Sequence, residues 1–194
     1  MVTVHVESRR TMIPNVCAKS LENKEMESVI VDYMLKSSDE RVVINDFVQG
    51  EPLSEENLDR TLELVSNLRK VDSANPCKMG VSEVENTDRF RLLFPNKSIW
   101  LYSGYELSLK KEYIPVDDFW NDEDEEYYRF ITDPKDNNIS DFKRSVIISK
   151  CDVVIDGRYI DSQRNPSKKF AGSDNQRVIS IAESLKQGKV IMLE

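Results

Sequence analysis

The 194-residue sequence is short of the residues from which most catalytic centres are built, with one histidine, three cysteines and six glycines. His5 lies in an alternating apolar pattern with no nucleophile near it, so a Ser-His-Asp or Cys-His arrangement is not expected. The cysteines, Cys17, Cys77 and Cys151, are far apart along the chain, whereas zinc and iron–sulfur sites group cysteines within a few positions. We therefore expect three free thiols and no metal ligand.

The sequence also lacks long apolar segments and an excess of basic residues. No apolar run approaches the roughly 18 residues that suggest a membrane helix, and the N-terminal stretch "MVTVHVESRRTM" has no apolar signal core. The 35 acidic residues outnumber the 27 basic ones, giving a net charge of −8. Phosphates repel such a chain, so nucleic acid is not an expected partner. These absences predict a cytoplasmic protein that binds neither membranes nor nucleic acid.

What is present is an alternation of strand-like and helix-like segments. β-branched or alternating stretches predict strands, and apolar residues at helical spacing predict helices. The helix at 52–70 is the clearest, because Ser54 is a natural N-cap and apolar residues recur on one face. The segment 144–150 is apolar but fits neither type. The predicted strands are 2–6, 41–47, 97–103, 151–156 and 189–194, and the predicted helices are 22–36, 52–70 and 175–188.

This alternation predicts a single α/β domain, residues 1–194, with a largely parallel sheet. A chain of this length with 39% hydrophobic residues is long enough to bury a core. Residues 71–90 mix proline, glycine and polar residues and predict a long connection.

An acidic, aromatic insertion is predicted at about residues 113–143. Seven acids fall within positions 117–126. Such a run is typical of a solvated surface segment. The alternative is a docking surface for another protein, because exposed aromatic side chains are common anchors at interfaces. The candidate partner-binding residues are Phe119, Trp120, Tyr127 and Tyr128.

Glycines follow three of the predicted strands. They are Gly50, Gly104 and Gly157. In parallel α/β folds ligands gather at the carboxyl ends of strands, where glycine lets the backbone approach them. Tight strand-to-helix turns require glycine equally, so the glycines by themselves leave both interpretations open.

At these junctions the sequence resembles the activating proteins of anaerobic ribonucleoside-triphosphate reductase, which are radical S-adenosylmethionine enzymes. The similarity lies in "FVQGEPLSEENLDRTLELVSNLRK", "FPNKSIWLYSGY", "DVVIDGRYI" and "FAGSDNQRVISIAESLKQGKVI". The resemblance implies an incomplete β/α barrel that binds S-adenosylmethionine beside a four-iron four-sulfur cluster. In that family the reduced cluster cleaves the cofactor, and the resulting radical abstracts hydrogen from a glycine of the partner reductase.

The sequence departs from this family where the cluster would be held. The family uses three cysteines in a C-x3-C-x2-C loop after the first strand. Those positions fall here on Arg9, Ile13 and Val16, and the neighbouring Cys17 gives at most one thiolate in any register. A cluster that needs three thiolates is therefore not expected.

Two further motifs of the family are partly retained. Its Gly-Gly-Asp reads here as Gln49-Gly50-Glu51, and its Arg-Gly-Ser-x-Asn-Gln-Arg begins with Ala171. A structural interpretation has Ser173 or Asp174 capping the helix at 175–188, while a functional one has that helix start holding a ligand carboxylate. The candidate residues for a residual S-adenosylmethionine or anion site are Gly50, Glu51, Ser173, Asn175 and Arg177.

The resemblance and the departures together predict a pseudoenzyme without a cluster, which acts as a protein-binding, regulatory or inhibitory protein. Its partner would be the anaerobic reductase or an unrelated target, such as a host protein if the chain is viral, and then in the host cytoplasm. No cofactor is expected, with S-adenosylmethionine as the one alternative. The competing hypothesis is an S-adenosylmethionine-dependent activase that generates a glycyl radical with atypical cofactor binding.

Overall fold

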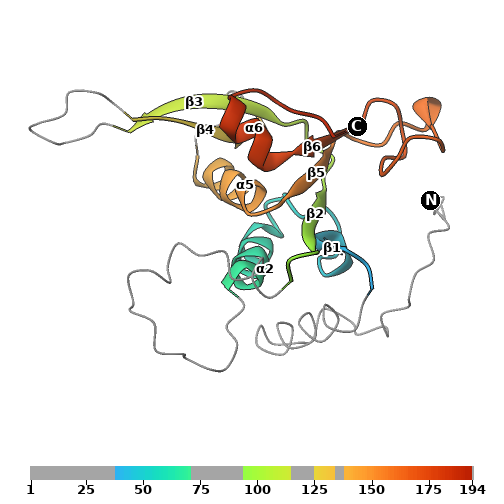
Figure 1. Ribbon diagram of the computed structural model, residues 1–194, viewed down its shortest axis with the longest axis horizontal. Helices are drawn as coiled ribbons and strands as arrows, with labels where there is room; N and C mark the ends of the chain where they lie inside the picture. Colours follow the sequence, from blue (N-terminus) through green and yellow to red (C-terminus); the bar gives the residue numbers. More distant parts are fainter. Residues whose placement is uncertain (1–37, 71–93, 115–124, 134–137, 194) are drawn as a thin grey trace, which may run out of the picture.

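The computed structural model describes residues 38–70, 94–114, 125–133 and 138–193 (Figure 1). The predicted strand at 2–6, the helix at 22–36 and the connection at 71–90 lie outside these residues, as do Arg9, Ile13, Val16, Cys17 and Cys77. The elements are β1 (Arg41–Val43), η1 (Ile44–Asp46), α2 (Leu58–Lys70), β2 (Ser98–Tyr102), β3 (Ser108–Ile114), β4 (Glu125–Ile131), α5 (Ile139–Ser149), β5 (Val153–Asp156), η2 (Asp161–Gln163), β6 (Arg177–Ser180) and α6 (Ile181–Gln187).

The main sheet has the strand order β1-β2-β5-β6. β1 and β5 each pair with β2 in parallel, and β6 pairs with β5 antiparallel. The mixed α/β fold with a largely parallel sheet is thus confirmed. Because side chains alternate across a sheet, each strand sends residues to both faces.

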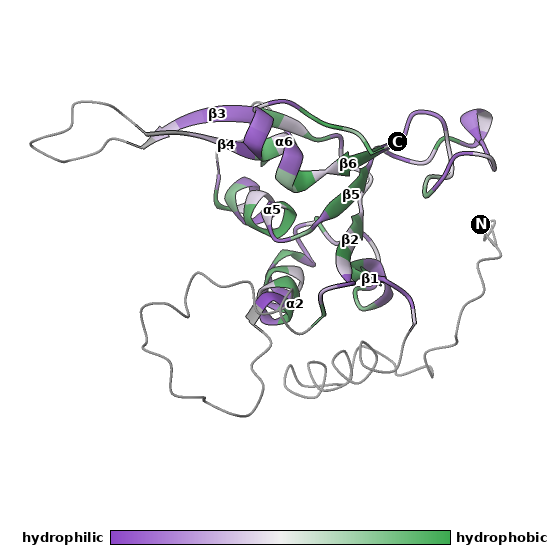
Figure 2. Ribbon diagram, in the orientation of Figure 1, coloured by the Kyte–Doolittle hydropathy of each residue, from purple (hydrophilic) through white to green (hydrophobic). Residues whose placement is uncertain are grey.

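One face of the sheet is covered by helices and forms the main core. Val42, Leu101, Val154 and Ile179 of the strands are buried with apolar residues of α2 and α5. Both helices lie on the same side of the strands (Figure 1), and the apolar stripe of α2 explains this, because Leu58, Leu64, Val65 and Leu68 are all buried. The strands β2 and β5 are correspondingly the apolar centre of the molecule (Figure 2).

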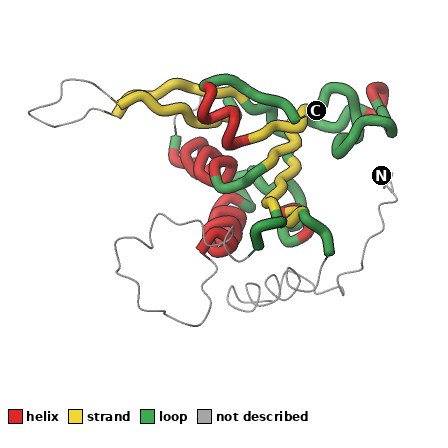
Figure 3. The backbone as a smooth tube through the Cα atoms, viewed as in Figure 1, coloured by secondary structure: helices red, strands yellow, loops and turns green. Residues whose placement is uncertain are grey.

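The opposite face of the sheet carries a second, smaller apolar cluster. Trp100, Val153, Ile155 and Val178 are buried there. Phe170 packs against this cluster from the connection between β5 and β6, which is mostly irregular chain (Figure 3).

The predicted insertion at 113–143 is built from regular elements. β3 and β4 form an antiparallel hairpin, and α5 follows it. The hairpin extends away from the main sheet (Figure 1), and β3 is largely hydrophilic (Figure 2). Residues 115–124 and 134–137 of the insertion lie outside the described part of the chain.

Several predicted elements are corrected by the structure. The helix predicted at 175–188 is two elements: Arg177–Ser180 is strand β6, and the helix begins at Ile181. The reason is that Val178 and Ile179 bury on opposite faces of the sheet, which requires a period of two. Gly188 ends the helix as expected, with φ of 64°. The segment 144–150, left undecided above, is the second half of α5 apart from Lys150.

Three boundaries also shift. Ser54 is not the N-cap of α2, because residues 52–57 form turns and the carbonyl of Asn57 accepts the first helical hydrogen bond, from the Thr61 N–H at 2.8 Å. The strand predicted at 41–47 ends at Val43 and continues as η1. The strand predicted at 189–194 is reduced to a single bridge between Ile179 and Met192.

None of the helices in the described part of the chain has the length and apolarity that a membrane crossing requires.

Candidate functional site

The three glycine-bearing turns meet at the carboxyl ends of the parallel strands. The Gly104 N–H donates to Oε2 of Glu51 at 2.7 Å, which joins the turn after η1 to the end of β2. The Gly157 N–H donates to the Tyr105 carbonyl at 2.9 Å, which joins the end of β5 to the same β2 turn. The structure therefore brings together the turns that the sequence marked, and we name them the strand-end junction.

Glu51 is the centre of the first half of this junction. Its Oε1 accepts hydrogen bonds from the Ser103 hydroxyl at 2.9 Å and the Leu53 N–H at 3.1 Å, in addition to the Gly104 bond on Oε2. Both carboxylate oxygens are thus occupied by donors of the protein itself. The arrangement fastens a turn to a strand end rather than presenting the acid to a ligand.

Gly50 has a structural role beside Glu51. Its φ of +91° lies in the left-handed region, which a residue with a Cβ adopts only with strain. The side-chain amide of Asn57 donates to the carbonyls of Gln49 and Glu51, both at 3.0 Å, and so spans the glycine. The turn geometry alone accounts for this glycine.

The second half of the junction is an ion pair between the buried Asp156 and the half-buried Arg177. Nε of Arg177 donates to Oδ1 of Asp156 at 2.9 Å, while Oδ2 accepts from the Leu107 N–H at 2.7 Å. The guanidinium also donates to the Leu107 carbonyl at 2.8 Å. The hydrogen bond to Asp156 raises the pKa of Arg177 above its ordinary value. Asp156 is fully buried and was not identified from the sequence, where it is only the last residue of an apolar strand.

The polar stretch 171–176 closes on itself and on the end of β5. Oε1 of Gln176 accepts from the N–H groups of Gly172 at 2.9 Å and Ser173 at 3.2 Å, and its Nε2 donates to the Gly157 carbonyl at 3.0 Å. Oδ1 of Asn175 accepts from the Ser173 hydroxyl at 2.7 Å. The stretch is therefore a clamped loop.

Both interpretations offered for a helix start at Ser173 or Asp174 are consequently wrong. The helix begins at Ile181, so these residues do not cap it and its N–H groups do not face Asn175 or Arg177. The polar residues serve the loop because side-chain amides can pair with backbone groups that no regular element satisfies.

Arg144 of α5 supports the junction from the helical side, and the sequence gave no hint of it beyond one basic residue in an apolar run. It is buried, and its Nε donates to the Leu53 carbonyl at 2.9 Å. Its Nη2 pairs with Glu55 at 2.6 Å, and its guanidinium lies 5.3 Å from the centre of the Tyr105 ring. The turn that holds Glu51 is thus fixed to α5.

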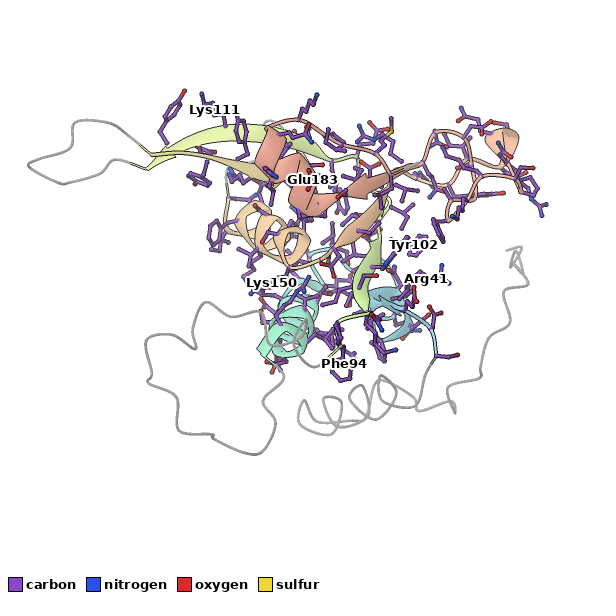
Figure 4. The ribbon with its side chains drawn as sticks, viewed as in Figure 1. Arg41, Phe94, Tyr102, Lys111, Lys150 and Glu183 are labelled. Atoms are coloured by element: carbon purple, nitrogen blue, oxygen red, sulfur yellow. The ribbon has the colours of Figure 1, made fainter. Side chains whose placement is uncertain are left out.

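A hollow of about 680 Å³ lies elsewhere, near the amino ends of β1 and β2. Trp100 and Phe170 form part of its wall, with ring centres 4.8 Å apart, and the Arg41 guanidinium lies within 6 Å of both rings. Figure 4 shows Arg41 and Tyr102 on the side of the strands away from α2 and α5. The hollow is also lined by Ser38, Asp39, Glu40, Asn96 and Ser98.

Cys151 is the one cysteine within the described residues, and it is unsuited to hold a metal. It is buried, and its thiol donates to the Ile147 carbonyl at 3.4 Å. Burial raises the pKa of this thiol to about 12, whereas a metal ligand must be a thiolate. Among the described residues no three histidine, cysteine or acidic side chains converge as a metal site would require.

The aromatic residues proposed for docking have different surroundings. Tyr127 is exposed on β4. Tyr128 packs against the end of α6, since a Cβ placed on Gly188 would lie 2.5 Å from its ring. Phe119 and Trp120 lie outside the described residues.

Comparison with known protein families identifies a match over most of the chain. Residues 13–179 match the family described as "4Fe-4S single cluster domain". No curated protein and no solved structure matches the chain.

Proposed function

The chain belongs to the 4Fe-4S single cluster domain family, and from this premise we propose that it is a pseudoenzyme derived from a radical S-adenosylmethionine activase, which acts by binding another protein. The proposal keeps the ancestry that the family and the sequence resemblance suggest. It assigns the present function to the surface of the molecule rather than to a cofactor.

The observation that carries the proposal is the internal use of the strand-end junction. Each candidate residue already bonds to the protein itself. Glu51 accepts from the Gly104 N–H at 2.7 Å, and the Asn175 amide donates to the Arg158 carbonyl at 2.8 Å. Nε of Arg177 donates to Asp156 at 2.9 Å. A ligand would have to compete with these internal hydrogen bonds, and displacing Arg177 would take the charged partner from the buried Asp156. The candidate cofactor residues therefore support a structural role.

The cysteines also fail to fit the cluster that the family name implies. Three thiolates are needed to hold a four-iron four-sulfur cluster with one iron open. The sequence has three cysteines in all, and one of them, Cys151, is a buried thiol bonded to a backbone carbonyl. The two remaining cysteines, Cys17 and Cys77, are one fewer than the three thiolates that such a cluster needs.

The β3–β4 hairpin, which lies outside the main sheet, favours protein binding as the function. The hairpin β3–β4 extends from the sheet (Figure 1), and the acidic run at 117–126 falls within its part of the sequence. Acidic surfaces with exposed aromatic residues suit basic protein partners. Candidate partners are the anaerobic reductase and unrelated proteins.

Anaerobic reconstitution with iron and sulfide tests the loss of the cluster. We expect the purified chain to stay colourless after desalting. A broad absorbance near about 400 nm that bleaches with dithionite would contradict the proposal, because it is the expected signature of thiolate-bound iron and sulfide.

Affinity capture from the native cell, followed by calorimetry with each purified candidate, tests the binding function. We expect a partner that binds in a defined stoichiometry. If no purified candidate gives a binding isotherm, the binding function is wrong.

The family description favours a second candidate function. This is an activase that holds a cluster with fewer thiolates and generates a glycyl radical in the anaerobic reductase. A coloured reconstituted protein that also cleaves S-adenosylmethionine would support this candidate over the first.

A further inference from the structure

The connection between β5 and β6, residues 157–176, extends beyond the sheet on the side opposite to the β3–β4 hairpin (Figure 1). We call these residues the β5–β6 loop. The loop is largely hydrophilic (Figure 2), and it contains four basic and two acidic residues in a chain whose net charge is −8. Its charge is therefore opposite in sign to that of the whole chain.

Hydrogen bonds across the β5–β6 loop fix its outgoing half to its returning half. The Asp174 N–H donates to the Gln163 carbonyl at 2.8 Å, and the Asn165 N–H donates to the Gly172 carbonyl at 3.0 Å. Nζ of Lys168 donates to the Asp174 carbonyl at 2.6 Å. The loop therefore has a defined shape without a partner, which reduces the conformational entropy that binding would cost.

Arg158 and Arg164 of this loop differ from other arginines of the molecule in having no acidic partner. Both side chains are exposed, and neither forms an ion pair or a side-chain hydrogen bond within the described part of the chain. A guanidinium can hold a carboxylate through two parallel hydrogen bonds, so these two arginines can accept carboxylates of a partner. Elsewhere an acidic side chain pairs with each of five arginines, which are Arg41, Arg69, Arg129, Arg144 and Arg177.

Two exposed apolar side chains lie between these arginines in the sequence. Tyr159 and Ile160 are each 37% exposed. The Tyr159 ring lies against Gly172, since a Cβ placed on this glycine would be 3.1 Å from the ring. The Ile160 N–H donates to the Ser173 hydroxyl at 3.3 Å, and Arg164 forms a β-bridge with Ser173. Tyr159, Ile160 and Arg164 are thus all held against the same two residues of the returning half.

Arg158 belongs to the same group of residues. It precedes Tyr159, and its carbonyl accepts from the Asn175 amide at 2.8 Å, two residues beyond Ser173. Arginine and tyrosine are enriched among the residues that contribute most to binding energy at protein interfaces. We give the name loop patch to four residues, which are Arg158, Tyr159, Ile160 and Arg164.

The two acids of the β5–β6 loop are engaged by neutral groups and leave the arginines unpaired. The Asp161 carboxylate accepts from the Tyr159 hydroxyl at 3.1 Å. The Asp174 carboxylate accepts from the Asn165 amide at 2.6 Å. The guanidinium charges of the loop patch are therefore not neutralised by ion pairs within the loop.

We propose that the loop patch is a docking surface and that its occupant is an acidic segment of another protein. The proposal rests on the proposed binding function and adds a surface apart from the hairpin. Carboxylates of the occupant would pair with Arg158 and Arg164, and an apolar side chain would cover Tyr159 and Ile160.

The charge of the whole chain favours a short acidic segment over a nucleic acid. A long phosphate backbone would meet the net charge of −8 over much of the surface. A short segment interacts mainly with charges within about 10 Å, because salt screens the rest. The exposed apolar side chains of the loop patch also suit a peptide that carries apolar residues among its acids.

The test titrates the full chain into a fluorescent synthetic peptide of glutamate with isolated leucines and follows the anisotropy. A matched peptide has glutamine at each glutamate position. The loop variant is Arg158→Gln, Arg164→Gln. The control variant is Lys186→Gln, Lys189→Gln, which removes two exposed charges in and next to α6. We expect the wild type to bind the acidic peptide, the loop variant to lose about tenfold in affinity and the control variant to change it by less than about twofold.

Circular dichroism should show that the loop variant is folded, because both replaced side chains are exposed. No binding of the acidic peptide to the wild type, or equal binding to the wild type and the loop variant, would overturn the proposal. Equal affinity for the glutamine peptide would overturn it as well. A single-stranded RNA that binds more tightly than the peptide, and loses that affinity in the loop variant, would show that the occupant is a nucleic acid instead.

Capture of the native partner distinguishes failure of the loop patch from failure of the binding function. If the wild type and the loop variant retain that partner equally, the binding function stands and the loop patch is wrong. If the wild type retains no partner, the binding function itself is wrong.

Discussion

Glu51 illustrates how an acidic residue in a strand-end turn can serve the fold. It accepts three hydrogen bonds from two turns and one strand end, and the length of the glutamate side chain allows it to reach all three donors. Cys151 is held by the fold in another way, since burial favours its neutral thiol.

Replacing Glu51 with glutamine should lower the free energy of unfolding by about 1–3 kcal/mol, because the new amide group would face a donor and one bond would be lost. Urea unfolding followed by circular dichroism measures this. Glu56→Gln is the matched control on the same turn, where the side chain is exposed, and it should change stability by less than about 0.5 kcal/mol. Equal effects of the two variants would show that the Glu51 bonds are unimportant.

Cys151 should resist alkylation in the folded protein. At pH 8 a thiol with a pKa of about 12 is almost entirely protonated, and only the thiolate reacts. Mass spectrometry after iodoacetamide treatment should find the Cys151 peptide unmodified without urea and modified with it. Since the folded pKa exceeds the ordinary value, the stability contribution of this thiol is complete below about pH 8.5 and is lost as the pH rises toward 12. Rapid alkylation of the folded chain would contradict the burial.

At the scale of elements, the end of α6 packs against the hairpin where Gly188 meets Tyr128. Gly188 ends α6 with φ of 64°, and the ring of Tyr128 fills the space where a Cβ would be. The sequence predicted the glycine stop correctly, because a residue after a helix in the left-handed region is usually glycine. The tyrosine on the other side of the contact is sixty residues earlier in the chain, and no local pattern connects the two.

Gly188→Ala should therefore destabilise the protein in two ways. The left-handed backbone of a residue with a Cβ costs about 1–2 kcal/mol, and contact with Tyr128 at 2.5 Å adds to this. In a Tyr128→Ala background only the backbone part should remain. A double-mutant cycle by urea unfolding measures the difference, and additive effects of the two changes would contradict the contact.

At the scale of the whole molecule, the strand ends of the sheet converge as in ligand-binding α/β folds, yet their polar groups are bonded to one another. The junction joins η1, β2, β5 and β6 through Glu51, Asp156 and Arg177. A small molecule that bound there would have to compete with these internal hydrogen bonds.

Calorimetric titration of the full chain with S-adenosylmethionine should accordingly give no saturable heat. The physical reason is that binding would have to compete with the Glu51 and Arg177 hydrogen bonds, and the buried Asp156 left without its charged partner would cost about 1–3 kcal/mol. A saturating isotherm with one site per chain, abolished by Arg177→Met, would instead show that the ancestral cofactor still binds.

The sequence by itself determined the fold class, the position of α2, β2 and β5, and the three turns that meet at the strand-end junction. These follow from local properties: apolar period, glycine, and the tendency of parallel strands to end at one edge. Only the tertiary structure decided that Arg177–Ser180 is a strand, that Asp156 and Arg144 hold the junction, and that Tyr127 and Tyr128 face different neighbours. Those outcomes depend on pairing between residues far apart in the chain, and a local pattern carries no information about such a partner.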